Sequence, residues 1–240
     1  MTAAPRVPAT EAADRRDPGA PAPEDLSLTS TVVLVRHALP MTGVCDDPGL
    51  APDGREQAAR AAAWLRWESP AAVVSSPYRR AVETAEPIAA ACGVTPAVDA
   101  DLREWDAARP PRYVTPELLG VDGGAAGPDD DPSAGRRGRA FAEGRFADFV
   151  PEHDREELRL RMTAAVRRAA ALWPGRTVVL VSHGGAVNNL MAGVLDLPRT
   201  FFFNPGYTSM CRVQVMSSGR LVPVSVNETA HLVSVRTALR

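Results

Sequence analysis

The sequence predicts an α/β protein in three layers, with a mostly parallel central sheet between helices and a cap insertion. Two apolar, β-branched runs, at residues 31–35 and 177–181, have the composition of strands that are buried on both faces. Each run is followed by polar residues that include a histidine, His37 or His183. Segments with helical periodicity lie between the strand-like runs, and this alternation favours parallel strands joined by helices.

The first half of the chain contains three predicted strands and two predicted helices. Pro52 suits a first helical turn, and a helix is expected from about 52 to 66 with its small apolar residues on one face. A strand is expected at 71–75. Ser76 and Pro77 then have the pattern of an N-cap and a first-turn proline. Pro87 should kink or restart that helix, Gly93 should end it, and 94–98 should form the third strand.

The second half begins with a glycine- and arginine-rich insertion at about 103–155, which has weak periodicity and is expected to set substrate specificity. An amphipathic helix is predicted from about 155 to 172, followed by the strand at 177–182 and a helix that opens at Gly184-Gly185. Residues 210–216 and 221–226 are expected to form two final strands. Proline-rich residues 1–29 are predicted to be a disordered tail, and 30–240 to be one domain.

Composition excludes several classes of protein. The chain has 240 residues, of which 45% are hydrophobic and 23% charged, and this is typical of a globular protein. A net charge of −2 argues against a surface devoted to nucleic acid or membrane, and no apolar run is long enough to span a bilayer. The 3 cysteines are widely spaced, and the N-terminus lacks the pattern of a secretory signal. We therefore expect a soluble, cytoplasmic protein.

The chemistry-bearing residues gather where strands end. Carboxyl ends of parallel strands lie along one sheet edge, so His37 and His183 could face each other there. The helix that starts near Ser76 would bring an arginine to the same edge. The helix start at Gly184 would add exposed N–H groups and a positive dipole end. All basic residues are arginines, whose planar forks suit phosphate, so the combination favours a phosphate pocket.

The motifs resemble those of the histidine phosphatase superfamily, which includes cofactor-dependent phosphoglycerate mutases and many small-molecule phosphatases. The resemblance covers roughly residues 31–235, in the order that the family has. It is carried by six segments: Leu-Val-Arg-His-Ala at 34–38, Asp-Pro-Gly-Leu-Ala-Pro-Asp-Gly-Arg-Glu-Gln-Ala at 47–58, Ser-Ser-Pro-Tyr-Arg-Arg-Ala-Val-Glu-Thr-Ala at 75–85, Leu-Arg-Glu at 102–104, Val-Ser-His-Gly-Gly at 181–185 and Asn-Glu-Thr-Ala-His-Leu at 227–232.

The resemblance implies a role for each matching residue. His37 would be the nucleophile that becomes phosphohistidine, and Arg36 and Arg80 would bind phosphoryl oxygens in bidentate fashion. His183 would stabilise charge on the equatorial oxygens, with the N–H of Gly184 beside it. Glu104 would protonate the leaving oxygen and then activate water. No metal and no cofactor are expected, because the helix start and the arginines would replace a metal.

Two departures from the family pattern bear on the activity. Ala38 stands where the family usually has glycine, and Leu39-Pro40 replaces the acidic and hydroxyl residues that are common in mutases. We therefore expect a metal-independent phosphatase acting on a small phosphomonoester. A mutase of the same fold and a catalytically silent module that binds a phosphorylated ligand stay open as alternatives. The expected partner is a small phosphorylated metabolite, with neither nucleic acid nor membrane, and a homodimer also stays open.

Several other residues are alternatives to the predicted site residues or have other expected places. Asp99, Asp101 and Asp106 lie near Glu104 in the sequence and are alternative acids. Arg79 is expected at the surface or in a supporting role. Two further histidines are not expected to react: His231 should pack near the sheet edge, and His153 should be exposed. Trp105 could lie either in the pocket or in the core.

Overall fold

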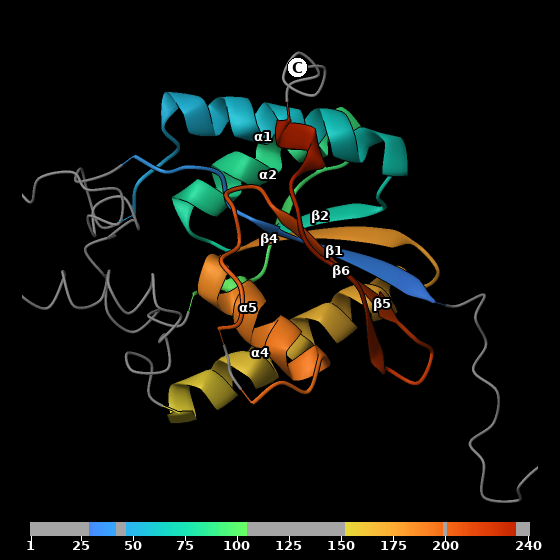
Figure 1. The fold of residues 1–240 in the computed structure, drawn as a ribbon. Coiled ribbons are helices and arrows are strands. Elements are labelled where there is room, and N and C mark those ends of the chain that lie inside the picture. The colour runs from blue at the N-terminus through green and yellow to red at the C-terminus, as the bar shows by residue number, and fades with distance from the viewer. Residues whose placement is uncertain (1–28, 42–46, 105–151, 199–200, 234–240) are drawn as a thin grey trace, which may run out of the picture.

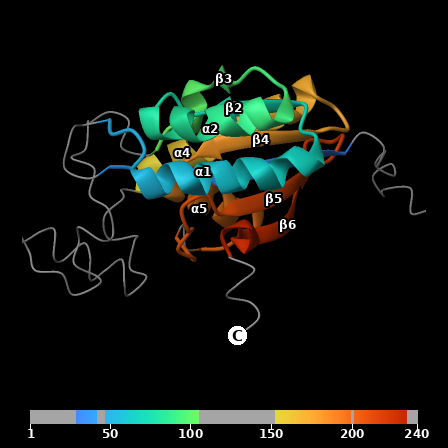
Figure 2. The same ribbon diagram turned by 90° about the horizontal axis from the view of Figure 1, so that it is seen from above.

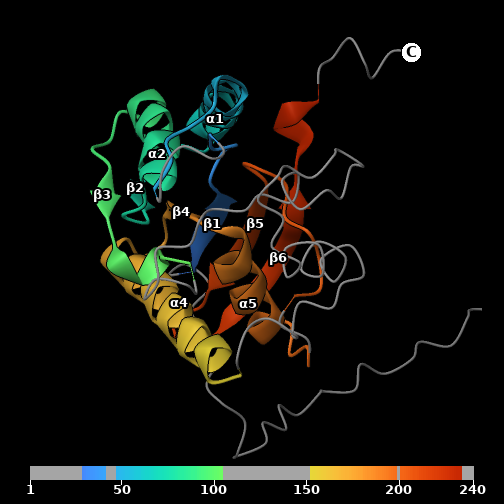
Figure 3. The same cartoon turned by 90° about the vertical axis from the view of Figure 1, so that its left-hand side faces the viewer.

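The computed structural model describes residues 29–41, 47–104, 152–198 and 201–233. Within these ranges a six-stranded sheet has the order β3-β2-β4-β1-β5-β6 (Figure 3). The first four strands in this order are parallel, β5 pairs antiparallel with β1, and β6 pairs antiparallel with β5 at the edge of the sheet. The strands are β1 (Ser30–Arg36), β2 (Ala72–Ser75), β3 (Ala97–Val98), β4 (Thr177–Ser182), β5 (Met210–Val215) and β6 (Leu221–Glu228).

Helices cover both faces of the sheet. Helices α1 (Pro52–Leu65) and α2 (Arg79–Cys92) lie on one face, and α4 (Glu152–Leu172) and α5 (Gly184–Val194) on the other (Figures 1 and 2). The predicted three-layer α/β class is therefore confirmed. The insertion expected at about 103–155 and the tail expected at 1–29 lie almost entirely outside the described residues. Among the described helices, none is long and apolar enough to cross a lipid bilayer.

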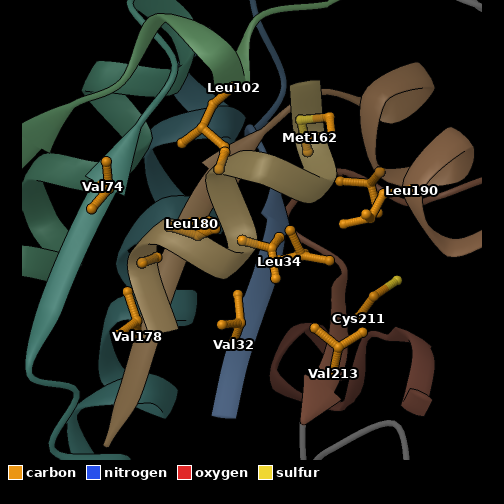
Figure 4. Packing of buried hydrophobic residues seen from close by; sticks show 14 of the residues in the cluster. Val32, Leu34, Val74, Leu102, Met162, Val178, Leu180, Leu190, Cys211 and Val213 are labelled. Atoms are coloured by element: carbon orange, nitrogen blue, oxygen red, sulfur yellow. The ribbon is translucent and has the colours of Figure 1, made fainter. Parts of the chain in front are cut away.

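The place of strand β1 at the centre of the sheet explains why its residues 32–35 are all apolar. It pairs with β4 on one side and β5 on the other, so neither of its edges is exposed. Val32 and Leu34 pack into the cluster under α4 and α5, which Figure 4 shows with Leu180 and Met162. The alternate residues of β1 pack under α1 and α2. Burial on both faces requires a continuous β-branched run rather than an alternating one.

Helix α2 corrects two predictions and confirms a third. It begins at Arg79 with Tyr78 as N-cap, so the expected cap at Ser76 is wrong. The expected restart at Pro87 is also wrong, because the helix runs unbroken across this residue. The end at Gly93 is confirmed, with a left-handed φ of 68° that glycine adopts without strain.

The third strand is shorter than predicted, since only Ala97 and Val98 pair with β2. Val94 instead continues the end of α2, where its N–H donates to the carbonyl of Ala89 at 3.0 Å. Pro96 has no N–H to offer to a neighbouring strand. Helix α4 begins at Glu152, slightly ahead of the predicted start, and β6 extends to Glu228.

The strand order fixes the place of the site. Because β1 and β4 are adjacent and parallel, with Arg36 opposite Ser182, the residues after the two strands emerge side by side. Strand β2 pairs with the other side of β4, so Ser76 emerges next to them, with its N–H bonded to the carbonyl of Val181 at 2.9 Å. The carboxyl ends of three parallel strands thus meet at one edge.

Candidate active site

Two buried histidines lie against each other at this edge. The N–H of His37 donates to the carbonyl of Ser182 at 2.8 Å, which places the residue directly beside the end of β4. The rings of His37 and His183 have centroids 5.2 Å apart, and their planes are inclined by 60°. Both residues are almost completely buried, with 2% and 0% of their surface exposed.

Arg80 connects the two rings. It lies in the first turn of α2 and is 3% exposed. Its Nε donates to Nε2 of His37 at 3.2 Å, and a second guanidinium nitrogen lies 3.2 Å from Nδ1 of His183. Because a guanidinium can only donate, both of these ring nitrogens must accept.

The remaining two ring nitrogens then carry the protons. Nδ1 of His37 lies 2.8 Å from the carbonyl oxygen of Ala38, which can only accept, so this nitrogen carries the hydrogen. Nε2 of His183 lies 2.7 Å from Oγ of Ser76 and donates to it. These bonds assign a neutral His37 whose Nε2 lone pair faces Arg80.

Electrostatics favour the same protonation states. Burial, reinforced by the charges of Arg80, His183 and Arg36, holds the pKa of His37 well below its usual range. Burial and the charges of Arg80, Arg36 and Arg161 likewise hold the pKa of His183 well below its usual range. Both imidazoles are therefore neutral at physiological pH, as a nitrogen nucleophile must be.

Arg36 forms the second positive wall of the site. One of its terminal nitrogens donates to the carbonyl of Pro205 at 2.5 Å, and its guanidinium carbon lies 3.9 Å from the centre of the Tyr207 ring. Its Nε is buried and has no hydrogen-bond partner among the described residues. A Cβ built on Gly184 would lie 3.3 Å from this nitrogen, so Arg36 crosses the start of α5 closely.

Glu104 lies over the first turn of α5. Its Oε2 accepts from the N–H of Gly185 at 2.9 Å, in agreement with the preference of helix N-termini for carboxylates. A Cβ on Gly185 would come within 2.6 Å of Oε1 of Glu104. Only glycine therefore leaves room for this carboxylate. The structure brings together all five residues predicted as catalytic (Arg36, His37, Arg80, Glu104 and His183), and Gly184 lies next to them.

The alternative residues lie elsewhere or have other partners. The carboxylates of Asp99 and Asp101 bind Arg168 at 2.5 and 3.0 Å. Arg79 is exposed and pairs with Glu83 at 2.7 Å, at the surface as expected. His231 lies near Oγ1 of Thr208 at 3.1 Å and packs by Trp64. Trp105, Asp106 and the side chain of His153 lie outside the described residues.

Sequence reasoning missed three residues of the site. Tyr207 stacks on Arg36 and lies 5.8 Å from the His37 ring, and Tyr78 lies 5.1 Å from the His183 ring. Ser76 accepts a hydrogen bond from His183 instead of capping a helix. Tyr78 and Ser76 belong to a motif that the sequence did offer, whereas Tyr207 comes from a loop without any local signal. Among the described residues, no cluster of His, Cys, Asp or Glu has the grouping of a metal site.

Comparison with known proteins agrees with this geometry. The sequence matches the model of a protein family, the histidine phosphatase superfamily (branch 1), over residues 32–118 and 128–229. A probable phosphoglycerate mutase of Yersinia pestis is 31% identical over 179 residues, which are 70% of this chain and 75% of that protein. The chain therefore belongs to the histidine phosphatase superfamily.

Solved structures of this fold also match closely. A mycobacterial glucosyl-3-phosphoglycerate phosphatase is 26% identical, with a TM-score of 0.62 over 83% of this chain and 99% of that one. A phosphoserine phosphatase of Entamoeba histolytica has the same TM-score of 0.62 over 85% of this chain and 100% of that one. Its identity is 22%, so this second likeness concerns the fold alone.

Proposed function

We propose that this protein is a metal-independent phosphatase that hydrolyses a small phosphomonoester through a phosphohistidine on His37. The observation that carries the proposal is the protonation state of His37. Its Nδ1–H is held by the carbonyl of Ala38, and its Nε2 lone pair is directed at Arg80. A neutral ring nitrogen among positive groups is what attack on a phosphate dianion requires.

The first half of the reaction forms a P–N bond to Nε2 of His37 while the P–O bond to the leaving group breaks. The leaving oxygen takes a proton from Glu104. In the second half, Glu104 accepts a proton from water, whose oxygen attacks phosphorus while the P–N bond breaks. Such acid–base catalysis contributes about 10²–10⁴-fold to a rate. The products are the free alcohol and inorganic phosphate, and Glu104 returns to its protonated form.

The charged groups around His37 fit the phosphoryl group. Two guanidiniums, from Arg36 and Arg80, offer paired N–H donors to its oxygens. Helix α5 begins at Gly184, directly after His183, and its start adds a positive dipole end. These fixed charges act on a transition state whose negative charge is spread over three equatorial oxygens. They supply the positive charge that other phosphatases take from metal ions.

The class of substrate is inferred from two relatives and from residues 39 and 40. The mycobacterial relative at 26% identity is named for a phosphorylated sugar acid, and it supports a small phosphorylated metabolite as substrate. The relative at 31% identity is named a probable mutase, so mutase activity is the second candidate. Leu39 and Pro40, which replace the polar segment common in mutases, favour the phosphatase.

The test is to trap the intermediate. The protein is quenched during turnover of a phosphate-labelled monoester, and we expect an acid-labile, alkali-stable label that His37→Ala abolishes. His153→Ala is the matched control and should keep the label. Absence of the label together with turnover by His37→Ala overturns the proposal. Isomerisation that depends on a bisphosphorylated primer, without release of phosphate, would establish the mutase instead. Binding of inorganic phosphate without hydrolysis of any monoester would establish a silent binding module.

A further inference from the structure

The turn that carries Glu104 has all of its last four carbonyl groups bound by side chains from distant parts of the chain. The 3₁₀ turn Ala100–Leu102 precedes Glu104, and Leu102 is completely buried. Oγ of Ser182 donates to the carbonyl of Leu102 at 2.7 Å. The other three carbonyls, those of residues 101, 103 and 104, accept from Arg161.

Arg161 makes these contacts with one guanidinium. One terminal nitrogen lies 2.7 Å from the carbonyl oxygen of Asp101 and 3.0 Å from that of Arg103, and the other lies 3.4 Å from that of Glu104. The side chain is 10% exposed, so water competes little for its donors. Its charge is balanced by Glu157 on the same helix, with the two groups 3.3 Å apart. A planar fork can bind several carbonyl groups at once, which a lysine ammonium on a flexible stem cannot do with the same geometry.

We infer that Arg161 is a positioning residue for the general acid, which holds the backbone of Glu104 so that its carboxylate reaches the start of α5. This inference rests on the role of Glu104 in the proposed function. The chain of contacts is continuous: Arg161 binds the carbonyl of Glu104, and Oε2 of Glu104 accepts from the N–H of Gly185. Among the described residues, Ser182 also binds one of these carbonyls, that of Leu102, and this bond does not depend on Arg161.

Leaving groups of different basicity test the inference. Dinitrophenolate is a weak base that departs without a proton, whereas phenolate and alkoxides need one, so only the latter depend on a placed acid. In Arg161→Gln we expect kcat/KM to fall about 10- to 100-fold for phenyl phosphate, because small misplacements of a reacting group cost this much. The value for dinitrophenyl phosphate should stay close to that of the wild type. Arg161→Lys, which keeps the charge, should restore only part of the loss.

Arg168→Gln is the matched control. It removes an arginine from the same helix, two turns later, which binds the side chains of Asp99 and Asp101 on the same turn but none of the four carbonyls. We expect the ratio of the two substrates to stay unchanged in this variant. Thermal melts of every variant give the folded fraction, and the substrate ratio does not depend on that fraction. An equal fall for both substrates in Arg161→Gln would reduce Arg161 to a structural residue and overturn the inference.

A comparison with Glu104→Gln separates this inference from the proposed function. If Glu104→Gln loses phenyl phosphate selectively and Arg161→Gln does not, the positioning role fails and the role of Glu104 stands. If Glu104→Gln shows no selectivity between the substrates, the assignment of Glu104 as the acid fails, and the positioning role fails with it.

Discussion

Replacing Gly185 by alanine should displace the carboxylate of Glu104 without moving Arg36 and Arg80, the two arginines proposed to bind the phosphate. The added Cβ would lie 2.6 Å from Oε1, 3.0 Å from Cδ and 3.1 Å from Oε2 of Glu104. Restoring an ordinary contact with Oε1 requires the carboxylate to move by about 0.8 Å, which a flexible side chain can do. That movement stretches the 2.9 Å hydrogen bond from the N–H of Gly185.

The size of the effect follows from this displacement. A reacting group misplaced by about 1 Å can lose about 10²-fold in rate, so we expect kcat for phenyl phosphate to fall about 10- to 100-fold. Inhibition by inorganic phosphate should change little, because the donors of Arg36 and Arg80 stay in place. Alanine in a helix is favoured over glycine by about 0.5–1 kcal/mol, so the melting temperature should not fall.

The assay combines steady-state kinetics on phenyl phosphate with a thermal melt. Gly193→Ala, on the same helix, is the control: its Cβ would meet Cδ of Arg159 at 2.8 Å, and that side chain is exposed and remote from the histidines. We expect full activity from it. A fully active Gly185→Ala variant would refute the reasoning, because Glu104 would then not need the place in which the structure holds it.

Three further predictions concern the guanidinium of Arg80, the protonation of the two histidines and the stability of the fold. Arg80→Lys should lower kcat/KM by about 10²–10³-fold, since one ammonium cannot replace the donors to both histidines. Near-normal kinetics would argue against the proposed role of Arg80. His37 and His183 stay neutral in the fold, so below the ordinary histidine pKa the unfolded state binds more protons. For each histidine, the free energy of unfolding should then fall by about 1.4 kcal/mol for every unit by which the pH is lowered. Denaturant titrations of wild type and His37→Gln should differ in this slope, and equal slopes would contradict the neutral state. Ser30→Ala should cost about 1–3 kcal/mol of stability without loss of activity, because Oγ of Ser30 is buried and accepts from the N–H of Gly175 at 3.0 Å. An unchanged melting temperature would show that this bond is dispensable.

Local patterns were enough to predict most of the elements. The β-branched runs that became β1 and β4 have no polar residue until their ends, and this is the composition of strands buried on both faces. The start of α1 at Pro52 and the end of α2 at Gly93 follow from backbone preferences that belong to single residues. These predictions hold because they depend on neighbours in the sequence.

The errors lie where a hydrogen bond overrode the preference of a single residue. Ser76 has the side chain of an N-cap, yet its hydroxyl binds His183, which is more than a hundred residues away. Val94 has the side chain of a strand residue, yet its N–H completes the end of α2. A tertiary hydrogen bond thus decided the role of Ser76, whereas a local bond between residues five apart in the sequence decided that of Val94.

The sequence by itself pointed to candidate residues of the site at the end of a strand or the start of a helix, because their neighbours define those elements. His37, Arg80 and Gly184 are identifiable in this way. Only the tertiary structure decided which ring nitrogen of His37 is the acceptor, since that depends on Arg80 from another element and on Ala38. It also showed that Arg168 binds Asp99 and Asp101, two acidic neighbours of Glu104, whereas Oε2 of Glu104 accepts from the N–H of Gly185. Hydrogen-bond partners far apart in the sequence leave no periodic trace, so folding alone assigns them.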